Sequence, residues 1–150
     1  MKKLIVIIPL LLVLHLAAFG QEKYDPDLAE KYKADDYGMK KYVMALLKRG
    51  PDVANYSDEE RDKIQEGHMA HIGHMVDAKK LVLAGPFFGD GELRGIFLFD
   101  VDNLEEAKEL TNEDPAVKTG VLTMELLEWY GSAAVMAIPE IHEKIQKIEI

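Results

Sequence analysis

Three histidines recur at three-residue intervals in one stretch of the chain: His68, His71 and His74. Imidazole is the side chain whose ordinary pKa lies nearest neutrality, so a histidine held in place by a neighbour can accept a proton and return it. On a helical wheel of about 100° per residue that starts at Ile64, His68 falls inside the apolar face, His71 at its edge and His74 outside it. The phasing therefore selects His68 as the histidine that burial and a partner can tune.

Two interpretations of His68 remain open at this point: a core histidine bonded to a backbone carbonyl, or a general acid and base. A metal site is a third interpretation, because two histidines three residues apart can share one face of a helix. The stretch lacks the H-E-x-x-H form, however, and His74 diverges from His68. We therefore predict no metal site. Proton transfer by a histidine needs no cofactor, and the chain has no nucleotide-binding glycine motif, so we also predict no cofactor.

Other candidate residues lie elsewhere in the sequence. Asp114 precedes Pro115, a pattern typical of a helix N-cap. Arg49 follows an apolar stretch and either binds an anionic substrate or is a solvated charge in a turn. Trp129 and Tyr130 end the last predicted strand, where aromatic rings either line the mouth of a pocket or complete the core. The sequence does not separate these alternatives.

The elements that must position these residues follow the order strand, helix, strand, strand, helix, strand. The patterns predict strands over 42–47, 81–84, 95–101 and 122–130, and helices over 59–78 and 103–110 with an extra turn at 115–119. This order predicts an α+β, ferredoxin-like β-α-β-β-α-β fold with an antiparallel sheet and both helices on one face. We also expect a short helix after Pro26 and an amphipathic helix after Pro139.

The third predicted strand is apolar on both faces. Ile96 and Leu98 point one way, and Phe97 and Phe99 point the other. Two helices cover only one face of a sheet, so the other face needs a second cover, for which another copy of the chain is the natural candidate. The sequence therefore predicts a face-to-face homodimer.

Residues 1–20 have the features of an export signal: Lys2 and Lys3, then an apolar run, then the small residues Ala18 and Gly20. We expect cleavage before Gln21, a periplasmic or secreted protein, and no association with the membrane after cleavage. The rest divides into a lead-in segment (21–40), one domain (41–131) and a C-terminal helical extension (132–150).

The composition excludes several classes of protein. The net charge is −9, and removal of the two lysines in the export signal makes it more negative, so binding to a nucleic-acid backbone is not expected. The chain has no cysteine, which excludes disulfides, thiolate catalysis and cysteine zinc sites.

Four motifs together resemble the YciI-like (YCII-related domain) family over about residues 40–130. They are His68-Met-Ala-His71, the Gly85 of Leu-Ala-Gly-Pro-Phe, Arg94-Gly95 and Glu113-Asp114-Pro115-Ala116. The resemblance implies a dimeric α+β barrel and a cleft that contains a catalytic His-Asp pair, here His68 and Asp114. We expect five residues to contact the substrate: Arg49, His71, Arg94, Trp129 and Tyr130. Small members of the family lack the export signal and both extensions, so their location in the cell does not carry over.

Two functions from different classes follow. The first is an enzyme for isomerisation or elimination of a small cyclic or aromatic-derived compound, with His68 as the base and Asp114 orienting its ring. The alternative is a non-catalytic dimer of the cell envelope that binds a ligand or a protein. A ligand that stabilises the protein without being converted would favour the alternative.

Overall fold

The computed structural model describes residues 24–148 of the chain. The predicted export signal lies outside the described residues. Within residues 24–148, no helix combines the length and the apolar character that a membrane crossing requires.

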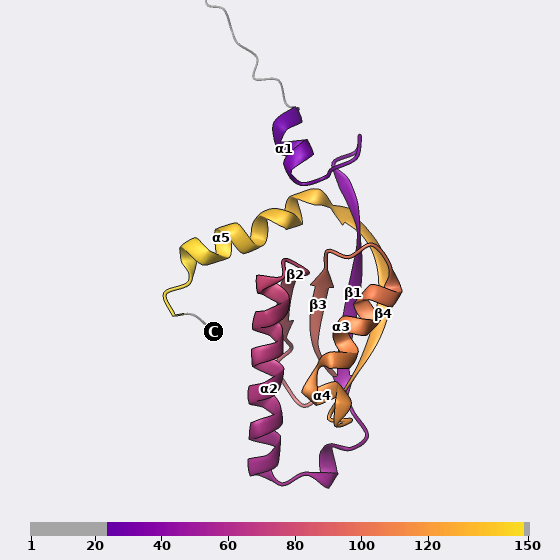
Figure 1. Cartoon of the computed structure of the whole chain (residues 1–150), viewed down its shortest axis with the longest axis vertical. Coiled ribbons are helices and arrows are strands. Elements are labelled where there is room, and N and C mark those ends of the chain that lie inside the picture. Colours follow the sequence, from indigo (N-terminus) through magenta and orange to yellow (C-terminus); the bar gives the residue numbers. More distant parts are fainter. Residues whose placement is uncertain (1–23, 149–150) are drawn as a thin grey trace, which may run out of the picture.

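A four-stranded antiparallel sheet forms the centre of the domain (Figure 1). Its strands are β1 (Met39–Arg49), β2 (Leu81–Pro86), β3 (Leu93–Phe99) and β4 (Leu122–Ser132), in the spatial order β2-β3-β1-β4. The helices α2 (Asp58–Asp77) and α3 (Leu104–Glu113) connect the strands and lie on the same face of the sheet. This topology confirms the predicted ferredoxin-like α+β fold.

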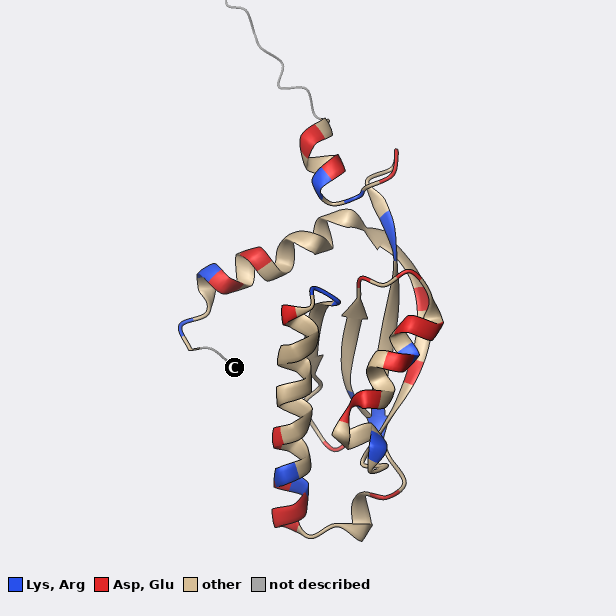
Figure 2. Ribbon diagram, in the orientation of Figure 1, with Lys and Arg blue, Asp and Glu red and all other residues tan. Residues whose placement is uncertain are grey.

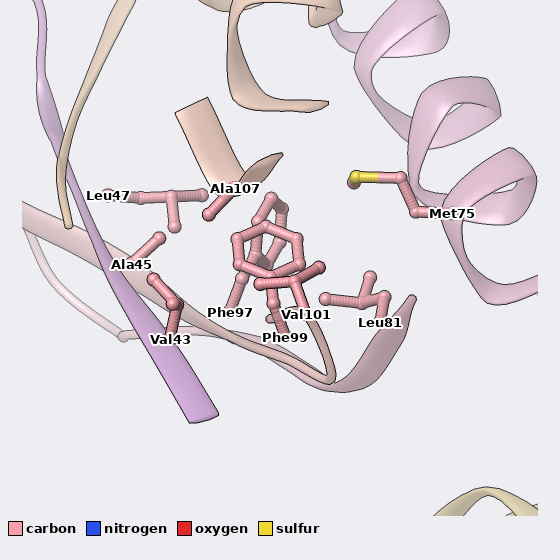
Figure 3. Packing of buried hydrophobic residues seen from close by; sticks show 9 residues of the cluster. All are labelled: Val43, Ala45, Leu47, Met75, Leu81, Phe97, Phe99, Val101 and Ala107. Atoms are coloured by element: carbon pink, nitrogen blue, oxygen red, sulfur yellow. The ribbon is translucent and has the colours of Figure 1, made fainter. Parts of the chain in front are cut away.

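The core lies between the sheet and these two helices (Figure 3). Alternation along β1 turns Val43, Ala45 and Leu47 toward the helices, and α2 and α3 contribute Met75 and Ala107. The remaining members of the cluster are Leu81, Phe97, Phe99 and Val101. Burial of this apolar surface, at about 25 cal/mol per Å², is the main force that holds the helices on the sheet.

Local signals in the sequence set the helix boundaries. The Ser57 side chain accepts a hydrogen bond from the Glu60 backbone, and the Glu60 carboxylate accepts one from the Ser57 backbone, which makes a capping box at the start of α2. The short helix α1 (Pro26–Lys31) begins after Asp25, whose carboxylate caps it. Two short 3-10 helices were not predicted: η1 (Val53–Asn55) and η2 (Ala133–Ala137).

Strand β1 is longer than its apolar run predicts. It extends from 39 to 49 instead of from 42 to 47, because β4 pairs with it from Met39↔Ser132 to Arg49↔Leu122. Backbone pairing therefore continues the strand through Lys40 and Lys41, whose side chains give no strand signal of their own.

The second face of the sheet is also apolar, as the sequence predicts. Leu98 is only 1 % exposed although it points away from the core cluster, whereas Leu127 on β4 is 42 % exposed. The C-terminal segment covers part of this face: the Lys40 ammonium, which pairs with Asp100, lies 4.0 Å from the sulfur of Met136 in η2. The uncovered remainder lies over β1 and β4.

The last helix, α5 (Ile138–Ile145), extends away from the sheet (Figure 1). Ile141 and Ile145 are 53 % and 73 % exposed. The helix is shorter than its isoleucine spacing predicts, and Ile148 lies beyond its end. An ion pair of 2.8 Å between Glu140 and Lys31 links α5 to α1. The hydrogen bonds that the Glu140 carboxylate accepts from Lys31 and Lys144 lower the pKa of Glu140 to about 2.

Candidate functional site

His68 and Asp114 meet in a hydrogen bond beneath helix α2. The distance from His68 Nδ1 to Asp114 Oδ2 is 2.7 Å. Helix α2 presents His68 on its buried side, and Asp114 ends α3. Asp114 is fully buried and His68 is 6 % exposed. The Phe97 ring stacks on the imidazole with centroids 5.9 Å apart, so packing as well as the carboxylate fixes the orientation of the ring.

Asp114 has a second role at the same time. Its Oδ1 atom accepts a hydrogen bond of 2.8 Å from the backbone N–H of Ala116, which caps the short helix α4 (Pro115–Lys118). Each oxygen of the Asp114 carboxylate therefore makes one contact: Oδ1 caps α4, and Oδ2 bonds His68.

A glycine allows α4 to approach α2 closely. A Cβ atom at Gly67 would lie 3.1 Å from Cγ of Pro115, closer than most real contacts of that kind. Gly67 thus brings the start of α4, and with it Asp114, next to His68.

This close packing predicts different outcomes for two glycine replacements in α2. Gly73 has no atom near its potential Cβ position, so Gly73→Ala should raise the free energy of unfolding by about 1 kcal/mol, the usual difference in helix propensity. Gly67→Ala should raise the free energy of unfolding clearly less than Gly73→Ala, or lower it, because the new methyl group contacts Pro115. Urea unfolding of both variants measures the difference. Equal gains would show that the contact at Gly67 is not tight.

The other two histidines have different surroundings. His71 is buried, and its Nε2 lies 2.9 Å from the backbone oxygen of Leu110. The interpretation of a core histidine bonded to a carbonyl therefore describes His71 rather than His68. His74 is exposed, in agreement with the helical phasing. Within residues 24–148, no group of three or more histidine, aspartate and glutamate residues could hold a metal ion.

A groove of about 480 Å³ lies beside the His68–Asp114 pair. Its wall includes Arg61, Ile64 and Gln65, which lie one to two turns before His68 on α2. Ala116, whose backbone binds Asp114, also lines it. The groove is thus lined by neighbours of the pair, whereas His68 and Asp114 are not themselves among its lining residues.

Two of the predicted substrate contacts line this groove, and three do not. Arg49, at the end of β1, and Arg94, in β3, are part of its wall. His71 lies outside it, with its ring bonded to α3. Trp129 stacks on Tyr42 with centroids 5.6 Å apart, and the Tyr130 hydroxyl donates to the Asp35 carboxylate.

The register of the sheet explains why the two aromatic residues lie elsewhere. Leu122, which lines the groove, pairs with Arg49, whereas Trp129 pairs with Tyr42. Seven residues of strand separate these positions, or about 23 Å at about 3.3 Å per residue. Trp129 and Tyr130 are therefore at the opposite end of β4 from the groove.

The second ring nitrogen of His68 is not fully buried. No hydrogen bond from His68 Nε2 is found among the described residues, and no described side-chain nitrogen or oxygen is both fully buried and without a partner. The Nε2 atom therefore keeps some contact with solvent although the residue as a whole is buried. One ring nitrogen is thus held by a carboxylate, and no hydrogen bond of the other is found within residues 24–148.

Arg61 and Gln65 belong to the site although the sequence pattern did not select them. Both precede His68 on α2, at spacings of seven and three residues, which place side chains on neighbouring parts of one helical face. This spacing is the signal that could have found them. A helical wheel that marks only apolar residues does not register such polar neighbours.

Residues 41–130 match the family model described as the YCII-related domain. The uncharacterized protein YjpA of Bacillus subtilis (strain 168) is 32% identical over 63 residues, which are 42% of this chain and 72% of YjpA. A solved structure of 5-chloro-2-hydroxyhydroquinone dehydrochlorinase from Burkholderia phenoliruptrix AC1100, in complex with 2,5-dihydroxybenzoquinone, aligns with a TM-score of 0.45 and 15% identity. That alignment covers 60% of this chain and 93% of the dehydrochlorinase.

Proposed function

The chain belongs to the YCII-related domain family, as its motifs predicted, and we propose that it is a cofactor-independent enzyme in which His68 and Asp114 transfer a proton. The proposed reaction is an isomerisation or an elimination on a small cyclic or aromatic-derived compound. The observation that carries the proposal is the 2.7 Å bond between a fully buried carboxylate and a histidine whose helix neighbours line a groove.

The proposed chemistry needs only these two side chains. Neutral His68 takes a proton from a carbon of the substrate through Nε2, and the electron pair of the broken C–H bond forms a double bond. Asp114 accepts the hydrogen bond from Nδ1–H, which fixes the tautomer and stabilises the imidazolium that forms. In an isomerisation the imidazolium returns the proton to another atom of the substrate. In an elimination the leaving group departs with its electron pair, and the imidazolium then releases its proton to the solvent.

Solvent hydrogen exchange tests the proposal whichever leaving group the substrate carries. The protein is incubated in D₂O with a panel of cyclic ketones, enones and lactones, and deuterium at the carbon next to the carbonyl is measured by proton NMR. Exchange that the wild-type protein catalyses is expected for at least one member. Ligand-induced thermal stabilisation without any exchange or conversion would instead support the non-catalytic binding protein.

We also propose that the chain forms a homodimer through the second face of its sheet. Met44, Leu46, Ile96 and Leu127 leave an apolar surface there that the C-terminal segment does not cover. Each Å² of apolar surface removed from water contributes about 25 cal/mol, so a face-to-face contact is favourable.

Sedimentation at micromolar concentration should therefore give a dimer. Leu127→Lys should shift the protein toward a monomer, because it places a charge on the apolar surface. Met69→Lys is the matched control: Met69 is 37 % exposed and lies on α2, on the other side of the sheet. A wild-type monomer, or equal effects of both variants, would contradict this mode of assembly.

A further inference from the structure

All arginines of the chain gather around one groove. The sequence contains three arginines and fifteen lysines. Arg49, Arg61 and Arg94 all line the groove beside His68, and no lysine lines it. The three come from different elements, the end of β1, the first turns of α2 and the start of β3. Only the fold brings them together.

The local charge of the groove is opposite to that of the whole protein. Asp62 is the one carboxylate among its lining residues, whereas the chain as a whole has a net charge of −9. Acidic residues occur on α1, α2, α3, α5 and β4, and the first turns of α2 carry both acidic and basic residues (Figure 2). A cationic concavity on an anionic protein concentrates small anions at that place.

Two of the guanidinium groups are held in position. Arg61 donates through Nη1 to the Tyr56 backbone oxygen at 2.6 Å and pairs with Asp58 through Nη2. Arg94 donates through Nη1 to the backbone oxygen of Gly89 at 3.0 Å. Each guanidinium group is already anchored on one side. The arginine side chain therefore loses less conformational entropy when its other N–H groups bind a ligand.

The third guanidinium group is less constrained. Arg49 is exposed, and no side-chain hydrogen bond of Arg49 is found within residues 24–148. It is therefore available to close on a bound anion.

Most of the other lining residues are apolar, which suits a ring. Val53, Ile64, Val121 and Leu122 line the groove together with Ala116. Its volume of about 480 Å³ is within the usual range for small-molecule sites, about 300–1,000 Å³. Arginine matches the planar geometry of a carboxylate with two parallel hydrogen bonds, which a lysine cannot do.

We propose that this groove binds a small cyclic carboxylate, with the acid group between Arg49, Arg61 and Arg94 and the ring on the apolar wall, next to His68. The assignment rests on the proposed function, because it names the substrate class of the same site. Arg61 becomes a binding residue in addition to Arg49 and Arg94.

Binding of 4-fluorobenzoate, followed by fluorine NMR, tests the assignment, with 4-fluorobenzamide as a neutral ligand of nearly the same shape. The acid should bind at least about tenfold more tightly than the amide, since charge-assisted hydrogen bonds are about twice as strong as neutral ones. Arg49→Gln should weaken binding of the acid about tenfold and leave the amide unchanged, and Arg49→Lys should give an intermediate loss. Lys63→Gln is the matched control, because Lys63 is an exposed cation on α2 outside the groove.

Arg61→Gln should act like Arg49→Gln, and a thermal melt checks that loss of the bond to Tyr56 has not unfolded the protein. Equal binding of acid and amide, or equal losses from Arg49→Gln and Lys63→Gln, would overturn the assignment. The binding assay requires no turnover. His68→Asn should still bind 4-fluorobenzoate, so failure of the proposed chemistry and failure of the anion site give different results.

Discussion

Replacement of His68 by Asn should lower any proton-transfer activity at least about 100-fold, the usual contribution of a general acid and base. The fold should survive, because the Asn amide nitrogen can donate to Asp114 Oδ2 in place of the imidazole Nδ1–H, which lies 2.7 Å from that oxygen in the wild-type protein. Rates of deuterium exchange, measured together with urea unfolding of the same protein, separate a loss of chemistry from a loss of structure.

His74→Asn is the matched control for this variant. His74 is the same residue type on the same helix, but it is exposed. Its replacement should leave the exchange rate unchanged within about twofold. A loss equal to that of His68→Asn would mean that the proton is transferred elsewhere, and the assignment of His68 as the base would have to be withdrawn.

Replacement of Asp114 by Ala should produce the largest loss of stability, about 3–5 kcal/mol. The change removes a helix cap, worth about 1 kcal/mol, and leaves the buried His68 ring without its partner, a cost typical of a broken buried pair. Asp114→Asn should cost less, because its side-chain oxygen can still accept from the Ala116 N–H. Urea unfolding of the wild type, Asp114→Ala and Asp114→Asn gives the three free energies of unfolding to be compared.

Asn103→Ala isolates the capping contribution. The Asn103 side chain caps α3 by accepting from the Glu106 N–H at 2.9 Å, and it is exposed, with no buried partner. Its loss should cost about 1 kcal/mol. If Asp114→Ala costs no more than Asn103→Ala, the bond to His68 does not contribute to the stability of the fold.

The effects of replacing His68 and Asp114 on the catalytic rate should not be additive. The double variant His68→Asn with Asp114→Asn should be little slower than His68→Asn alone, because Asp114 acts through the ring that the first change has already removed. Multiplicative losses would indicate that Asp114 has a separate role.

The order of elements was predictable because its signals are local. Apolar alternation marks the strands, and the caps at Asp25, Ser57 and Asn103 all mark real helix starts. Such signals depend on neighbours within about four residues, so the sequence contains them directly. The length of β1 was underestimated because its ends are set by pairing with β4, which is a distant segment.

The site was predictable only in part, for the same physical reason. Helical phase selected His68, and the family resemblance selected Asp114, which lies 46 residues away in the chain. Nothing in the local pattern indicates which end of β4 meets the groove. Of the residues expected to contact the substrate, Arg49 and Arg94 line the groove, whereas Trp129 and Tyr130 lie at the far end of β4.

The double use of Asp114 also governs the local dynamics of the domain. A fluctuation that unwinds the first turn of α4 must release the Ala116 amide, and the same movement of the carboxylate takes the hydrogen-bond acceptor away from His68. Opening of the helix start and loss of the aligned imidazole are therefore one cooperative event. The stability of the start of α4 and the alignment of the imidazole are therefore linked through one carboxylate.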